Sequence, residues 1–169
     1  MTPRTALTAL VAGLLAVVTA APAQAADTWT AQLSGSQEVP AQPSPGRGSA
    51  VFQLSADGTA ISHRLVVANV DNVVAAHIHL APAGVNGPVV AFLFGPAAPG
   101  GGTSNGVIAT GTITAANLVG PLAGQPLQSL VDAIDAGNAY VNVHTNDGNP
   151  STPPGPGDLP GGEIRGQLH

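Results

Sequence analysis

In Val73-Val74-Ala75-Ala76-His77-Ile78-His79-Leu80, an apolar run leads into a stretch in which apolar residues alternate with histidines. Successive side chains of a β-strand point to opposite faces, so Val74, Ala76, Ile78 and Leu80 form one apolar row. His77 and His79 stand together on the other face. The alternation predicts a half-buried strand that turns its histidines away from the core.

Similar strand patterns recur at short intervals on both sides of this stretch. They cover residues 28–33, 49–55, 61–68, 89–94, 107–113, 140–145 and 163–168. Residues 56–59 predict a hairpin turn, and Asn86-Gly87 is typical of a type I′ turn. The segments 34–47 and 95–105 are predicted to be loops. The 22 Gly and 16 Pro residues therefore act as turn residues between strands.

One segment departs from the strand pattern. Leu127, Leu130, Val131 and Ile134 recur at helical spacing, with a proline before them and Gly137 after them. This predicts one short amphipathic helix. The expected fold is all-β: an immunoglobulin-like, Greek-key β-sandwich of about eight strands with one inserted helix.

Composition excludes several classes of function. The chain has 169 residues and a net charge of −5, and its only basic residues, apart from histidine, are 4 arginines. Such a chain has no basic stripe to bind nucleic acid, and no polybasic helix to bind a membrane surface. It has no cysteine, which excludes disulfides and thiolate-bound metals. Aromatic residues make up 3%, so the core is expected to be aliphatic.

The N-terminus has the pattern of an export signal. Arg4 precedes an uncharged apolar run over residues 6–20, and Ala23-Gln24-Ala25 is a small-x-small cleavage site. We expect residues 1–25 to be a signal peptide that is removed after Ala25. The mature domain would then be 26–169, secreted to the extracellular space, cell envelope or periplasm, and not associated with a membrane.

Three of the predicted strands place polar side chains on the face away from the core. Besides His77 and His79, these are Tyr140, Asn142 and His144 in one strand and Glu163 and Arg165 in the last. If these strands are neighbours, all seven side chains converge on one outer patch. His63 is predicted at the edge of the core, and His169 is terminal.

The patch has two interpretations, which the residues leave open. His77, His79 and His144 can supply three nitrogen ligands to copper or zinc. Alternatively, the histidines and their neighbours form a hydrogen-bond network that holds the long 145–162 loop over the sheet. No residue is predicted to be catalytic.

Four blocks of the sequence resemble the CHRD domain, the module named after chordin. They are Leu33-Ser34-Gly35-Ser36-Gln37-Glu38-Val39-Pro40, Ala76-His77-Ile78-His79-Leu80, Ala139-Tyr140-Val141-Asn142-Val143-His144-Thr145 and Gly162-Glu163-Ile164-Arg165-Gly166-Gln167-Leu168. The resemblance implies an immunoglobulin-like sandwich in a secreted bacterial protein of unassigned activity. It does not carry over chordin's antagonism of signalling ligands, which is a property of a larger protein.

The histidines also resemble, more loosely, the copper ligands of copper/zinc superoxide dismutase, which pairs an HxH strand with a later histidine. No histidine lies between His79 and His144, so that family's bridging and zinc ligands have no counterpart. Two functions follow as hypotheses. The first is a non-enzymatic binding or structural module for an unidentified extracellular ligand or protein. The alternative is a copper-binding protein that uses His77, His79 and His144.

Overall fold

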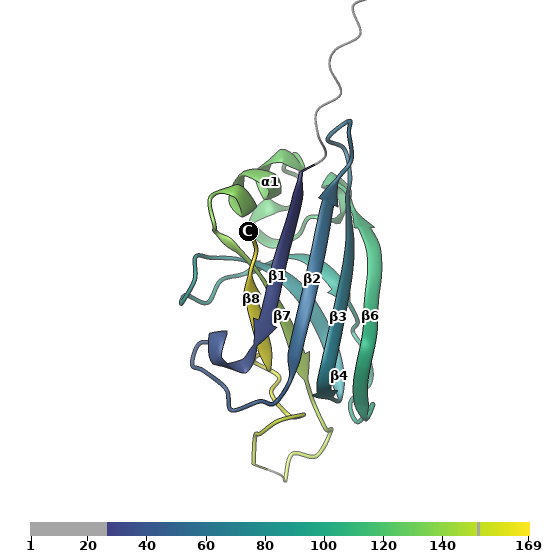
Figure 1. Ribbon diagram of the computed structural model, residues 1–169, viewed down its shortest axis with the longest axis vertical. Helices are drawn as coiled ribbons and strands as arrows, with labels where there is room; N and C mark the ends of the chain where they lie inside the picture. The colour runs from purple at the N-terminus through teal and green to yellow at the C-terminus, as the bar shows by residue number, and fades with distance from the viewer. Residues whose placement is uncertain (1–26, 152) are drawn as a thin grey trace, which may run out of the picture.

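The computed structural model describes residues 27–151 and 153–169, and β-strands dominate this part of the chain (Figure 1). The strands are β1 (Thr28–Ser34), β2 (Arg47–Leu54), β3 (Ile61–Asp71), β4 (Val73–Leu80), β5 (Val89–Phe94), β6 (Thr103–Ile113), β7 (Ala139–Thr145) and β8 (Ile164–Gln167). The helical segments are η1 (Gly35–Gln37), η2 (Ala115–Asn117), η3 (Gly120–Leu122) and α1 (Gln128–Asp135). The all-β class with one short α-helix is confirmed.

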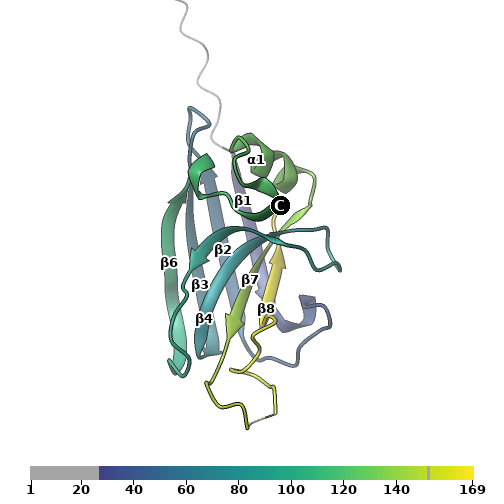
Figure 2. The same cartoon turned by 180° about the vertical axis from the view of Figure 1, so that it is seen from behind.

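The strands of the described residues form one nearly closed antiparallel sheet in the order β5-β4-β7-β8-β1-β2-β3-β6. β8 joins the two halves of this sheet. Arg165 pairs with Ser34 of β1, and His169 exchanges backbone hydrogen bonds of 2.8 and 3.1 Å with Thr30. Because of this junction, a single sheet folds over into two layers (Figures 1 and 2). The two separate sheets of an immunoglobulin-like Greek-key sandwich are not confirmed.

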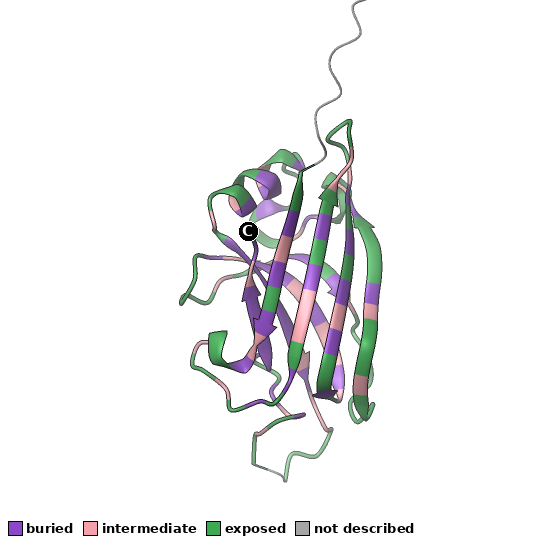
Figure 3. Ribbon diagram, in the orientation of Figure 1, coloured by how far each residue is buried: buried purple, intermediate pink, exposed green. Residues whose placement is uncertain are grey.

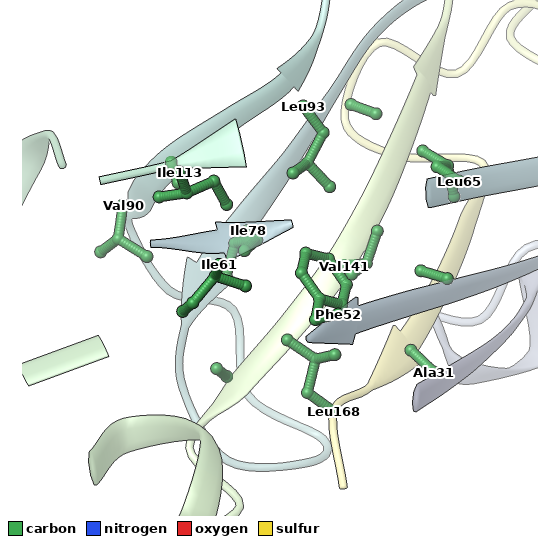
Figure 4. Close-up of a cluster of buried hydrophobic side chains, with 14 of the residues drawn as sticks. Ala31, Phe52, Ile61, Leu65, Ile78, Val90, Leu93, Ile113, Val141 and Leu168 are labelled. Atoms are coloured by element: carbon green, nitrogen blue, oxygen red, sulfur yellow. The ribbon is translucent and has the colours of Figure 1, made fainter. Parts of the chain in front are cut away.

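The apolar core lies between the two layers. Leu65 of β3 on one side and Ile78 of β4 and Val141 of β7 on the other are fully buried (Figure 4). Buried and exposed residues alternate along β3, as its colouring shows (Figure 3). Apart from Trp29 and Phe52, the core cluster is aliphatic, as composition predicted. Burying each Val, Leu or Ile side chain contributes about 1.5–3 kcal/mol of hydrophobic stabilisation.

β3 and β6 are both longer than the sequence predicted. β3 continues to Asp71 past Asn69, which has a φ of 55° at a shift in the pairing with β6. Asparagine enters this left-handed region more readily than most residues, so the strand bends without ending. β6 begins at Thr103, and the preceding loop is correspondingly shorter.

The type I′ turn predicted at Asn86-Gly87 is wrong. β4 and β5 do pair, but the whole of 81–88 connects them, and the positive φ in it belongs to Gly84. Tertiary contacts set this loop. The Asn86 amide donates to a carbonyl of another loop at 2.7 Å, and the Gly87 N–H donates to the Tyr140 hydroxyl at 3.1 Å.

The predicted helix is present as α1, which lies at one end of the folded sheet (Figure 1). Leu130, Val131 and Ile134 are its buried residues, as their spacing indicated. The predicted signal peptide, residues 1–25, lies outside the described residues. Within those described, no helix is long and apolar enough to cross a membrane.

Candidate metal centre

Polar side chains of three adjacent strands share the face of the sheet opposite the core. The pairing of β4 with β7 sets His77 opposite Asn142 and His79 opposite Tyr140. The pairing of β7 with β8 sets Asn142 opposite Arg165. The structure therefore brings together on one face the side chains that strand alternation assigned to it.

This predicted patch lies on the face opposite the core, but loops cover it and keep most of its side chains from solvent. Arg165 and Glu163 are each 1% exposed, Tyr140 is 2% exposed and Asn142 is 3% exposed. The loops before β2, β5 and β8 fold back over these side chains and bond to them. Alternation along a strand assigns a side chain to a face, but it contains no information about what covers that face.

His77, His79 and His144 form a cluster on this covered face. The Nδ1 atom of His77 lies 3.1 Å from Nε2 of His144. One ring nitrogen from each histidine lies within 4.8 Å of the corresponding atoms of the other two. His77 and His144 are partly buried, and His79 is 8% exposed. No other such group of potential metal ligands occurs among the described residues.

Backbone carbonyls fix the tautomers of two of these rings. Nδ1 of His79 donates to the Gly87 carbonyl at 2.9 Å, and Nδ1 of His144 donates to the Pro160 carbonyl at 2.9 Å. A carbonyl only accepts, so the lone pair of each neutral ring lies on Nε2. Nε2 of His79 is buried and has no hydrogen-bond partner in the described structure. In metal sites, a histidine that binds the metal through one ring nitrogen commonly donates the N–H of the other to a carbonyl, as His79 and His144 do here.

The cluster is uncharged at neutral pH. Burial lowers the pKa of all three histidines below the usual value of 6.5. For His77, burial together with the charges of His144 and His79 lowers the pKa to about 4. All three imidazoles are therefore neutral, and the neutral imidazole is the form whose nitrogen lone pair binds copper or zinc.

Aromatic rings enclose the cluster on two sides. Phe92 lies edge-on to the His77 ring with centroids 4.9 Å apart, and it is 54% exposed. Tyr140 stacks on His79 with centroids 4.9 Å apart and an angle of 13°. The Arg165 guanidinium carbon lies 3.4 Å from the centre of the Tyr140 ring, on which it makes a cation–π contact.

The remaining predicted patch residues hold loops in place. The Glu163 carboxylate accepts hydrogen bonds from the Ser44 hydroxyl at 2.6 Å, the Thr145 hydroxyl at 2.7 Å and the Gly157 amide at 2.8 Å. Arg165 donates to the Val85 carbonyl at 2.8 Å. Both interpretations of the patch thus have support, because the histidines converge and their neighbours fix the covering loops.

Sequence reasoning missed Glu38, which belongs to the covering loop before β2 and is only 5% exposed. Burial raises its pKa to about 7, although the nearby Arg165 charge and an Asn142 hydrogen bond oppose this rise. Its Oε1 atom has no hydrogen-bond partner in the described structure. A lone glutamate in a loop has no periodicity, so the only signal that could have found it was its place in the Leu33–Pro40 block.

The other two histidines lie outside the cluster. His63 is 9% exposed and stacks on Phe52 with ring centroids 6.0 Å apart, which agrees with its predicted place at the core edge. His169 is exposed, although its backbone pairs with Thr30.

The fold and the cluster define an all-β chain in which three histidines converge beneath covering loops. The chain belongs to the CHRD domain family, because the model of the CHRD domain matches residues 29–152. The matched span includes His77, His79 and His144 and ends before β8. Searches of curated proteins and of solved structures found no match to the chain.

Proposed function

We propose that this chain is an exported copper-binding module whose ligands are His77, His79 and His144. The proposal rests on the buried Nε2 atom of His79, which has no hydrogen-bond partner among the described residues, while Nδ1 of the same ring is held by a carbonyl. Leaving a buried polar atom unpaired costs about 1–3 kcal/mol. A metal ion bound at this nitrogen removes that cost.

Copper suits the available donors. The cluster consists of imidazoles, without thiolate or carboxylate among the described residues, and imidazole is a good ligand for copper and zinc. Among divalent ions of this series, copper binds a given nitrogen site most strongly. Since His79 and His144 are already oriented by carbonyls, little ordering is needed when the ion binds.

The structural module remains the second candidate function, supported by the bonds from Glu163 and Arg165 to the covering loops. Those bonds explain why these two residues are buried. They do not explain the Nε2 atom of His79, for which the described part of the chain provides no hydrogen-bond partner. Export, with a signal peptide over residues 1–25, is part of the same proposal and rests on the sequence pattern alone.

Copper titration of the purified, metal-free chain tests the proposal. We expect one copper ion per chain, with binding weakened on the order of 100-fold or more in the His77→Ala/His79→Ala double variant. Copper at 100 times its Kd should stabilise the wild-type fold by about 2.7 kcal/mol, which a thermal melt detects. A parallel zinc titration establishes which of the two metals the site prefers.

His169→Ala is the matched control, because it removes a histidine that lies outside the cluster. It should bind copper as the wild type does. Equal copper uptake by the wild type and the double variant, with no thermal shift in either, would refute the metal site. The structural module would then be the better account.

A further inference from the structure

Arg165, Tyr140 and His79 form a column that ends at the histidine cluster. The guanidinium lies 3.4 Å from the centre of the Tyr140 ring, and that ring stacks on His79 at a centroid separation of 4.9 Å. Arg165 and Tyr140 are 1% and 2% exposed, so little water screens one end of the column from the other. A buried positive charge is thus held near one wall of the candidate site.

The acceptors that hold Arg165 are uncharged. Its hydrogen bonds go to the carbonyls of Pro82 and Val85 and to the side-chain oxygen of Asn86, at 2.8–3.3 Å. Carbonyl dipoles keep the guanidinium in place without cancelling its charge. Glu38 is the carboxyl whose charge acts on Arg165, and burial opposes the ionisation of that carboxyl.

The candidate ligands also contribute no negative charge. The cluster holds three imidazoles and no carboxylate among the described residues. An ion bound there keeps its full charge in a site of low polarity, and Arg165 repels it. This repulsion is twice as large for a divalent ion as for a monovalent one.

From this geometry we infer that the site binds Cu(I) in preference to Cu(II), and that the Arg165 guanidinium, held over Tyr140, sets this preference. The inference rests on the proposed copper site and specifies which form of the metal that site takes. Arg165 acts here as a residue that tunes the site electrostatically, since it touches neither the ion nor a ligand.

Two variants at this site should have opposite effects. Arg165→Gln removes the positive charge but keeps hydrogen-bond donors for the loop carbonyls, so the ratio of Cu(I) to Cu(II) affinity should fall by about tenfold. Glu38→Gln removes the compensating negative charge, so the same ratio should rise. Arg165→Lys keeps the positive charge and should leave the ratio close to that of the wild type.

The affinities for the two ions are measured separately on the full chain at pH 8, where Glu38 is ionised. Cu(I) is titrated without oxygen against a chromophoric Cu(I) chelator, and Cu(II) is titrated in air against a competing amino acid. Circular dichroism confirms that each variant is folded. If Arg165→Gln does not fold, the raised ratio expected of Glu38→Gln and the unchanged ratio expected of Arg165→Lys decide the question.

Shifts of opposite sign in Arg165→Gln and Glu38→Gln would support the inference, because general loosening of the site would weaken both ions in both variants. An unchanged ratio in folded variants that still bind copper would overturn it and leave the copper site standing. Failure of the wild type to bind either ion would refute the copper site itself.

Discussion

Glu38 is a carboxyl group that folding removes from water without providing a full set of partners. One oxygen has no partner in the described structure, and the other accepts only a long bond of 3.5 Å from the Asn142 amide. Burial raises the pKa from 4.5 to about 7. The folded protein therefore holds a proton that the unfolded chain releases between these two pH values.

Replacing Glu38 by Gln should make the free energy of unfolding fall less as the pH rises from 4.5 to 8. In the wild type, the free energy of unfolding has its full contribution from the Glu38 proton below pH 4.5 and loses it as the pH rises through 7. Glutamine cannot ionise. The free energy of unfolding of Glu38→Gln should therefore rise by up to about 3 kcal/mol relative to that of the wild type between pH 4.5 and 8.

Urea unfolding of both proteins across this pH range measures the difference. The histidines are present in both, so their contributions cancel. A difference between the two proteins that stays constant with pH would show that Glu38 ionises at its ordinary pKa.

At the scale of elements, Glu163 is where three segments of the chain meet. Its carboxylate accepts bonds from Ser44 in the loop before β2, from Thr145 at the end of β7 and from Gly157 in the loop before β8. The two hydroxyls in turn accept bonds from the Gly46 and Leu159 amides. One carboxylate thus ties two covering loops to the sheet.

Glu163→Gln should loosen both loops while leaving the core intact. Removing the charge weakens three buried hydrogen bonds, and turning an amide N–H toward a donor breaks at least one of them, at a cost of about 2–4 kcal/mol. Hydrogen exchange should show faster exchange at the amides of Ser44, Gly46 and residues 157–159, and little change at Leu65 and Val141. Ser44→Ala, which removes a single donor, should give a smaller effect at the same positions. Equal acceleration throughout the core would instead indicate global destabilisation.

At the scale of the whole molecule, the nearly closed sheet reaches its stability without any covalent cross-link. The chain has no cysteine, and its core depends on aliphatic packing between the two layers. β8 completes the sheet by joining β7 to β1, so the last residues of the chain are part of the fold. A chain of this kind can fold outside the cytoplasm with no need for an oxidant.

Export should remove residues 1–25. Expressed in full in a bacterium with a general secretion pathway, the protein should be recovered outside the cytoplasm with Ala26 as its first residue, as intact-mass measurement would show. Ala25→Phe places a large side chain at the cleavage site and should block processing. A wild-type protein that keeps Met1, or is found only in the cytoplasm, would contradict the signal peptide.

Much of this architecture could be predicted because strand alternation is a local property. The spacing in residues 73–80 was enough to put His77 and His79 on one face and Ile78 in the core, and the spacing after Leu127 was enough to indicate a helix. The turn at Asn86-Gly87 was mispredicted because distant contacts, and not local preference, shape that loop.

The all-β class, the aliphatic core, the CHRD resemblance and the face shared by the histidines were all predictable, since each depends on composition or on neighbours in the chain. Three features are visible only in the folded chain: loops cover this face, carbonyls orient His79 and His144, and Glu38 lies buried near Arg165. These features depend on contacts between residues far apart in the chain. The free-energy cost of burying their polar groups depends on those contacts, so a local sequence pattern cannot predict it.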